Sequence, residues 1–325
     1  MLEFLTSLFE TSRPGDTPLD GTEAALERAI DKTDRRLRAL GDYRKRLLEP
    51  TGRALRHINR LVEQLPEPAE ISPARYGQDA RLRAVFASAE HLSDALGQFQ
   101  TIRNFLESHA GPLPDDIFGL LTMLKKERRM LGMEMDGDQM QRDVLQTALT
   151  FEDHRFIAPS GSEADARQLL ATLGFDYLLE KALGVIAAHK NRRGELVLQR
   201  QLLRRKLLSP TSDLSGLTDF GALEAKIAEI DAELGEFSGI ELSLDDSLHL
   251  LVSVLNEAEQ WLSASSFEAG LDYRNVVSTS SEAICLDELC SLNGMRRTVL
   301  FGRIPRSQLP APKDPLKLGQ AYLGE

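Results

Sequence analysis

Apolar residues recur at alternating three- and four-residue steps through most of this chain. In residues 20–49 the repeat runs through Leu26, Ile30, Leu37, Leu40 and Leu47. This spacing places one apolar stripe along one side of an α-helix, where it can pack against a partner. The pattern therefore predicts that long amphipathic helices are the main building element.

The 14 prolines separate these periodic blocks. Because proline removes a backbone donor and clashes with the preceding turn, continuous helices are expected only between prolines. Pro50 is expected to kink or end the first helix. Further helices are expected over about 55–65, 79–107, 115–149, 162–208 and 244–263, with Asp79, Ser88, Asp115 or Asp116, and Ser162 at their starts.

The longest proline-free block, 162–208, would extend about 70 Å if it were helical throughout. After the polar residues 209–219, apolar residues resume with the spacing of a coiled-coil seam, at Leu223, Ile227, Ile230, Leu234 and Phe237. Two such helices joined by a short polar connection predict an antiparallel hairpin.

The pattern changes only beyond residue 266. Val, Thr, Tyr and Phe concentrate in 271–280 and 296–305, which predicts two strands. The residues between them fit a short helix capped by Ser281 or, nearly as well, a strand ending in an Asn293-Gly294 turn. A small mixed α/β segment is expected here.

The expected fold class is mainly α: an elongated helical bundle with an antiparallel coiled-coil hairpin and a small C-terminal mixed α/β segment. Its expected parts are a short amphipathic helix and linker (1–19), a helical bundle (20–160), the long hairpin with the helix that follows it (161–265), the α/β segment (266–310) and a flexible tail (311–325).

Composition excludes several protein classes. The 325 residues are 42% hydrophobic and 27% charged, which is typical of a globular protein and unlike a disordered or fibrous chain. The net charge of −11 argues against a protein that coats nucleic acid or anionic membrane. Two cysteines cannot form a disulfide scaffold, and no apolar run is long enough to span a bilayer, so a cytoplasmic location is expected.

One strongly basic segment lies in 189–208, where seven basic residues and one acid give a net charge of +6. A basic helix of this kind can follow the phosphates of nucleic acid. Residues 219–246 carry nine acids and one lysine, so pairing between the two hairpin helices is the preferred interpretation. The basic residues are Lys190, Arg192, Arg193, Arg200, Arg204, Arg205 and Lys206.

Candidate catalytic chemistry is confined to Glu152, Asp153 and His154. A carboxylate beside a histidine can serve acid–base catalysis or hold a metal. However, the spacing does not match HExxH and no second histidine lies nearby in the sequence, so capping of helix ends is preferred. No catalytic residue, cofactor or metal is expected, and a metal-dependent enzyme at this cluster is the least favoured alternative.

The first ten residues form a further candidate contact. A helix there would gather an apolar side from Leu2, Phe4, Leu5, Leu8 and Phe9, followed by the linker TSRPGDTPLD. Docking into a groove of the chain itself or of a partner is preferred over a membrane surface, because this segment has a net charge of −2.

These features predict a non-enzymatic cytoplasmic scaffold or adaptor subunit that binds protein partners through amphipathic and coiled-coil helices. Self-association is a further expectation. Nucleic-acid binding through the basic helix is the alternative.

Overall fold

The computed structural model describes residues 21–136, 139–208, 220–235, 243–272, 274–278, 283–292 and 294–310. The chain divides into two compact units, which we call the sheet unit and the helical unit. Of the described residues, the sheet unit contains those of Arg56–Gly174 and those from Glu259 onward, and the helical unit contains those of Asp20–Leu55 and Phe175–Ala258. Helices α3 (Tyr43–Glu63) and α7 (Glu163–Leu208) contribute residues to both.

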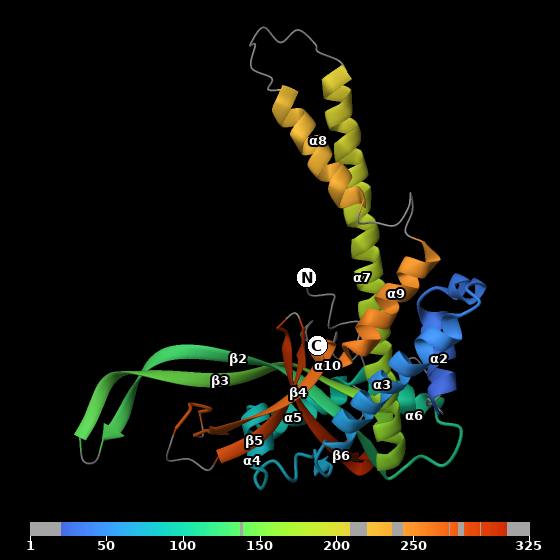
Figure 1. The fold of residues 1–325 in the computed structure, drawn as a ribbon. Helices are drawn as coiled ribbons and strands as arrows, with labels where there is room; N and C mark the ends of the chain where they lie inside the picture. The colour runs from blue at the N-terminus through green and yellow to red at the C-terminus, as the bar shows by residue number, and fades with distance from the viewer. Residues whose placement is uncertain are drawn as a thin grey trace, which may run out of the picture. The chain divides into compact units, whose positions relative to one another are not determined.

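The sheet unit contains most of the regular elements (Figure 1). Its strands are β1 (Ala69–Glu70), β2 (Asp116–Asp136), β3 (Gln139–Ser160), β4 (Leu262–Gly270), β5 (Ala283–Ser291) and β6 (Arg296–Pro305). Its helices are α4 (Ala80–Val85), α5 (Ala89–Gln98), α6 (Gln100–Ser108), α10 (Ala258–Trp261), which begins at the unit boundary, and the 3-10 turn η2 (Arg306–Gln308).

The six strands form one sheet in the order β3-β2-β6-β5-β4. Neighbours along this path are antiparallel, whereas the short β1 pairs parallel to β6. Strand β5 pairs with Arg296–Val299 of β6, and β1 pairs with Gly302 and Arg303 farther along the same strand. Strand β1, which follows α3, therefore pairs with the part of β6 that β5 does not reach.

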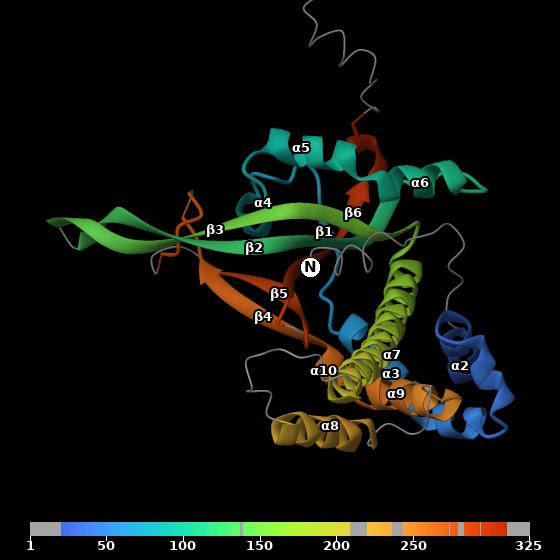
Figure 2. The same cartoon turned by 90° about the horizontal axis from the view of Figure 1, so that it is seen from above.

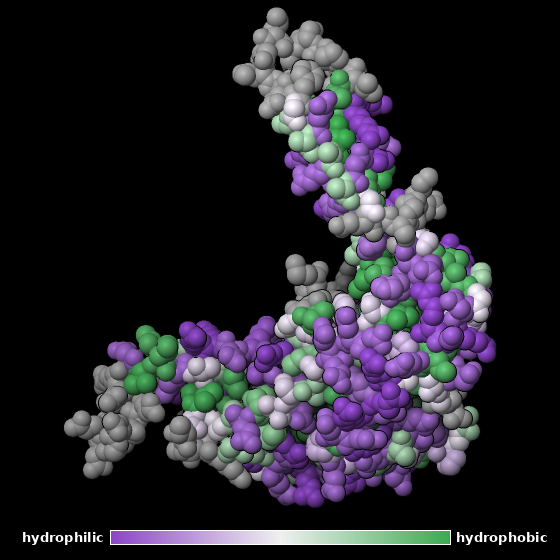
Figure 3. All heavy atoms as spheres, in the orientation of Figure 1, coloured by the Kyte–Doolittle hydropathy of each residue, from purple (hydrophilic) through white to green (hydrophobic). Residues whose placement is uncertain are grey.

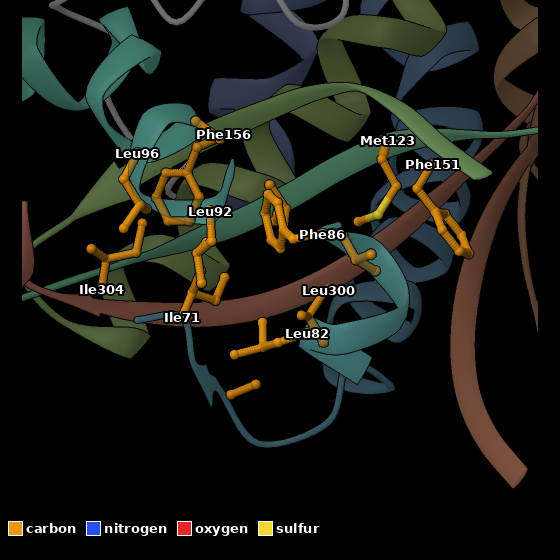
Figure 4. Close-up of a cluster of buried hydrophobic side chains, with 14 of the residues drawn as sticks. Ile71, Leu82, Phe86, Leu92, Leu96, Met123, Phe151, Phe156, Leu300 and Ile304 are labelled. Carbon is orange, nitrogen blue, oxygen red and sulfur yellow. The ribbon is translucent and has the colours of Figure 1, made fainter. Parts of the chain in front are cut away.

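Both faces of the central strands are covered. Helices α4, α5 and α6 lie on one face, and the parts of α3 and α7 that belong to this unit lie on the other (Figure 2). The first core includes Phe86, Leu92, Leu121, Phe156 and Leu300, several of which are labelled in Figure 4. The second core includes Leu120, Ile157, Leu170, Val299 and Phe301. Alternate residues of β2 and β6 thus enter opposite cores.

Two glycines let the first core close against the sheet. Gly119 of β2 and Gly302 of β6 are directly paired across the two strands. A Cβ at Gly302 would lie 2.4 Å from Cδ1 of Ile71, and one at Gly119 would lie 2.6 Å from the ring of Phe156. A larger residue at either position would displace a buried side chain.

Strand β3 contains three irregularities, each with a residue in the left-handed region. Asp143, Asp153 and Ala158 have φ values of 62°, 51° and 54°. Each lies where the register between β2 and β3 shifts because β3 has one extra residue. Such bulges bend a strand and re-aim its side chains.

The helical unit contains α2 (Gly21–Lys32), the 3-10 turn η1 (Arg35–Ala39), α8 (Phe220–Gly235) and α9 (Leu244–Asn256), with the shared parts of α3 and α7. Asp176 of α7 holds α2 through two basic side chains. It accepts hydrogen bonds from Arg28 Nε at 2.6 Å and from Lys32 Nζ at 2.5 Å. Because the carboxylate is nearly buried, these charges stabilise each other where water screens them poorly.

The prediction of a mainly α, elongated helical bundle is wrong, because the protein has a mixed α/β fold. The described residues form a six-stranded sheet as well as helices. The error lies mainly in 115–149, where the expected helix is replaced by β2 and the first half of β3. Ile117, Leu120 and Leu121 imitate a helical stripe because β2 is buried on both faces, so it lacks the simple alternation of a half-exposed strand.

Several local predictions are confirmed. Asp79 and Ser88 cap α4 and α5 through their side-chain oxygens, and Ser162 Oγ accepts a hydrogen bond from the Asp165 amide at the start of α7. The strand predicted at 296–305 is β6. By contrast, Pro50 lies inside α3, and 271–280 contributes only isolated bridges at Leu271, Val276 and Val277 among its described residues.

A buried ion pair lies where β2 passes beyond the end of β6. Glu288 of β5 is 2% exposed, and its Oε1 atom lies 2.8 Å from Lys125 Nζ. The same ammonium group lies 3.9 Å from the ring centroid of Phe267 on β4. The Lys125 ammonium group of β2 thus contacts side chains of both β5 and β4.

We expect the Glu288→Gln variant to be less stable by about 3 kcal/mol, because it leaves the Lys125 ammonium without its buried carboxylate. Urea unfolding of the full chain measures the difference. The control is Glu152→Gln, which breaks the exposed pair with Lys126 and should cost less than about 1 kcal/mol. Equal losses in the two variants would contradict a special role for the buried pair.

Candidate functional site

The predicted Glu152, Asp153 and His154 cluster lies on β3 at its middle bulge. Glu152 Oε2 accepts a hydrogen bond from Lys126 of the neighbouring strand at 2.5 Å. Asp153 Oδ2 accepts one from Arg297 of β6 at 2.9 Å. Each carboxylate thus has its own basic partner, and the two do not converge on a shared position.

Arg297 explains the charge state of Asp153. Burial raises the pKa of the Asp153 carboxyl, but hydrogen bonds and charges from Arg297 and Arg155 outweigh that effect and hold the pKa below its usual range. Since the Arg297 side chain is only 3% exposed, the ionised carboxylate is the partner that makes its burial tolerable. This arrangement suits a structural ion pair.

His154 packs among rings and has a fixed tautomer. Its ring stacks on Phe86 with centroids 4.6 Å apart, and it meets His91 edge-on at 5.6 Å. The Nε2 atom donates a hydrogen bond to the Val85 carbonyl at 3.0 Å. Burial lowers the pKa of His154, so the neutral ring is favoured in the folded protein.

No group of three or more His, Cys, Asp or Glu side chains suited to hold a metal occurs in the part of the chain that the structure describes. His91 and His154 come from α5 and β3, a proximity that the sequence alone did not indicate. Glu152, Asp153 and His154 are consecutive in the sequence, but their side chains contact separate partners and do not converge on one site.

The basic helix predicted at 189–208 forms the second half of α7, and part of it pairs with α8. Arg192 donates to Glu233 at 2.8 Å, while Arg200 and Arg204 both reach Asp231 at 3.0 Å. The order of these partners is that of two antiparallel helices. Lys190 and Arg193 also lie on α7, and the side chain of Lys206 lies outside the described residues.

The predicted N-terminal contact, Leu2 to Phe9, also lies outside the described residues.

A two-stranded ribbon is the main surface that sequence analysis missed. Strand β2 pairs with β6 only as far as Met123, and β3 is contacted by the 275–277 segment near Thr147 and Leu149. Beyond these points, the strand pairings within the described residues join β2 and β3 only to each other, up to Asp136 and Gln139. The stretch of β2 from residue 124 to 136 corresponds to roughly 40 Å of extended chain.

The outer part of the ribbon exposes a leucine pair. Leu131 and Leu145 are direct cross-strand partners and are 66% and 64% exposed. By strand alternation they lie on the same face as the paired residues Glu127 and Leu149, so this face leads back to the first core. Figure 3 shows hydrophobic surface among hydrophilic surface along this ribbon.

Exposed charges lie between the leucine pair and the body of the sheet. Lys126, Arg128 and Arg129 are exposed on β2 together with one acid, Glu127. Alternation places Lys126 and Arg128 on one face and Arg129 on the other. On β3 the acids Asp143 and Glu152 are exposed as well, so the described outer ribbon combines an apolar pair with charges of both signs.

Comparisons with known proteins identified no relative. No protein-family model, no curated protein and no solved structure matched the chain. None of the helices in the described ranges is both long enough and apolar enough to cross a bilayer.

Replacing His154 by Phe should weaken the acid sensitivity of the fold while preserving a ring against Phe86. Because the folded-state pKa is depressed, the unfolded chain takes up the proton more readily as the pH falls below about 6.5, and stability is lost. Thermal unfolding at pH 7.5 and 5.5 should show a smaller fall in Tm for His154→Phe than for the wild type.

The matched control for this pH experiment is His249→Gln, which changes an exposed histidine of α9. It should leave the difference in Tm unchanged. If His154→Phe and His249→Gln behave alike, His154 does not carry the pH dependence.

Asp231→Asn should loosen α8, since one substitution weakens the ion pairs with both Arg200 and Arg204. Hydrogen exchange is expected to become faster in Phe220–Gly235 and to approach the wild-type rate at high salt, where these exposed pairs are screened in both proteins. Glu229→Gln, an exposed acid on the same helix, provides the control. Equal exchange in both variants would argue against pairing as a determinant of the hairpin.

Proposed function

We propose that this chain is a non-enzymatic scaffold or adaptor that binds a protein partner through the outer end of the β2–β3 ribbon. The observation that carries this proposal is the exposed leucine pair, Leu131 and Leu145, at directly opposed positions of the ribbon. Paired apolar side chains on an extended strand surface match the way in which many proteins present a contact to another chain.

The energetics of a two-stranded ribbon support a bound state. An isolated pair of strands is at best marginally stable in water, because it buries little apolar surface. Its outer edges also present backbone groups that another strand can pair with. A partner that covers Leu131 and Leu145 removes apolar surface from water and holds both strands in register.

The local charges define the chemistry of the partner. Lys126 pairs with Glu152, whereas the neighbouring Arg128 and Arg129 are exposed and form no ion pair within the described residues. We therefore propose an apolar groove flanked by carboxylates on a different protein. Complementary charges of this kind mainly speed association and orient the two surfaces.

The helical hairpin supplies a second surface for the same scaffold role. Leu198 and Leu202 of α7 lie one turn apart and are half exposed. Arg192, Arg200 and Arg204 already have acidic partners on α8, which is why we favour protein binding over nucleic-acid binding for this helix. We further propose a cytoplasmic location, which is compatible with the free thiols Cys285 and Cys290.

Site-specific crosslinking in the native cell tests this function. A photoreactive amino acid at position 131 should give one discrete adduct with another protein, and Leu145→Glu in the same chain should abolish it. Because Leu145 is already exposed, its replacement should leave the Tm unchanged. The control places the photoreactive group at Leu292, a half-exposed leucine of the sheet unit outside the ribbon.

A heterogeneous set of adducts, equal at positions 131 and 292, would contradict the proposal. An adduct of twice the chain mass would assign the ribbon to self-association and overturn the choice of a different protein as partner.

A further inference from the structure

A polar pocket lies at the edge of the sheet unit, apart from the ribbon contact. Its volume is about 550 Å³, within the range of small-molecule sites. Four arginines and two acids contribute to its lining: Arg75, Arg81, Arg83, Arg303, Glu70 and Asp79.

The parallel pairing of β1 with β6 brings the first of these charges together. Glu70 of β1 lies opposite Arg303 of β6 in the register of the two strands. Arg303 Nη2 donates to Glu70 Oε2 at 2.9 Å, and Arg75 Nε lies 3.6 Å from the same oxygen. One carboxylate oxygen is thus placed between two guanidinium groups.

The remaining two arginines come from α4 and differ in how their charge is balanced. Arg81 forms a two-bonded pair with Asp79, with distances of 3.1 and 2.7 Å. Arg83 donates to the Gly77 carbonyl at 2.8 Å, and no carboxylate of the described chain lies within ion-pair distance of it. A neutral carbonyl satisfies a hydrogen bond but leaves the charge of Arg83 uncompensated.

Arg303 also pairs with Asp116 at 3.1 Å, so the four arginines have three carboxylate partners and keep an excess of one positive charge. Guanidinium groups bind phosphate and carboxylate oxygens through paired hydrogen bonds, and they remain charged at all physiological pH values. Of the described residues that line the pocket, none is aromatic, and the apolar ones are Pro68 and Ala80. The described lining therefore offers no aromatic ring on which a nucleobase could stack.

We propose that this arginine-lined pocket binds a compact anion with at least two negative charges: inorganic phosphate, pyrophosphate or the phosphate monoester of a small polar molecule. In the absence of this ligand, the Glu70 carboxylate pairs with Arg303 and Arg75 and would compete with the anion for them. Arg75 and Arg83, which are both exposed, supply the charge that is least engaged within the protein.

Calorimetric titration of the full chain with pyrophosphate at constant ionic strength tests the site. The wild type should bind one equivalent with a Kd of about 1 mM or tighter. Arg83→Gln should weaken binding about tenfold, the effect of losing one charge-assisted hydrogen bond, without changing the Tm. Glu70→Gln should tighten binding, because it removes the competing carboxylate.

Arg53→Gln is the matched control, since Arg53 is an exposed arginine of α3 that pairs with Glu49 outside the pocket. It should bind pyrophosphate as the wild type does. Parallel titrations with inorganic phosphate and glycerol phosphate identify the class of ligand. Tighter binding of inorganic phosphate indicates a free anion, and tighter binding of glycerol phosphate indicates a phosphate ester.

Either of two results would overturn the proposal: no saturable binding by the wild type, or equal weakening in Arg83→Gln and Arg53→Gln. Arg83 is exposed, so its substitution remains informative even if Glu70→Gln destabilises the β1–β6 contact.

Discussion

Burial of β2 and β6 on both faces is the constraint on which the sheet unit depends. These strands lie at the centre of the sheet, and their alternate side chains enter two separate cores. Hydrophobic burial is proportional to the apolar area removed from water, so a strand covered twice gains more than an edge strand does. The covering helices come from distant parts of the chain, and packing in the two cores holds them to the sheet.

The ribbon is the consequence of extending one covered strand beyond its cover. Strand β2 continues after Met123, where its pairing with β6 ends, and β3 pairs antiparallel with this extension. At that transition the interior changes from apolar side chains to the buried pair of Lys125 and Glu288, and farther out Leu131 and Leu145 are exposed. The same strand therefore supplies part of the core, a buried charge pair and the proposed contact surface.

The edge of the sheet has a different character from the ribbon. The two-residue strand β1 is too short to contribute much burial, yet its pairing with β6 places Glu70 and Arg303 side by side. The proposed anion pocket and the proposed protein contact thus lie on different strands and use different chemistry. One depends on charges held by local turns and pairing, and the other depends on apolar groups that the fold leaves uncovered.

Local signals in the sequence determined the helix starts and the hairpin of α7 and α8. Asp79, Ser88 and Ser162 act through hydrogen bonds within a few residues, so their capping roles can be read from neighbouring positions. The opposite charges of 189–208 and 219–246 likewise predicted pairs such as Arg200 with Asp231, because the two helices are consecutive.

Only the tertiary structure decided the strands β2 and β3, the ribbon and the pocket. A strand buried on both faces carries apolar residues at consecutive positions, and Ile117, Leu120 and Leu121 therefore fit a helical stripe as well as they fit β2. The opposition of Leu131 and Leu145 depends on the bulges of β3, and the pairing of Glu70 with Arg303 joins residues 233 positions apart. Contacts of this kind result from strand register and chain topology, which a local pattern of residues does not encode.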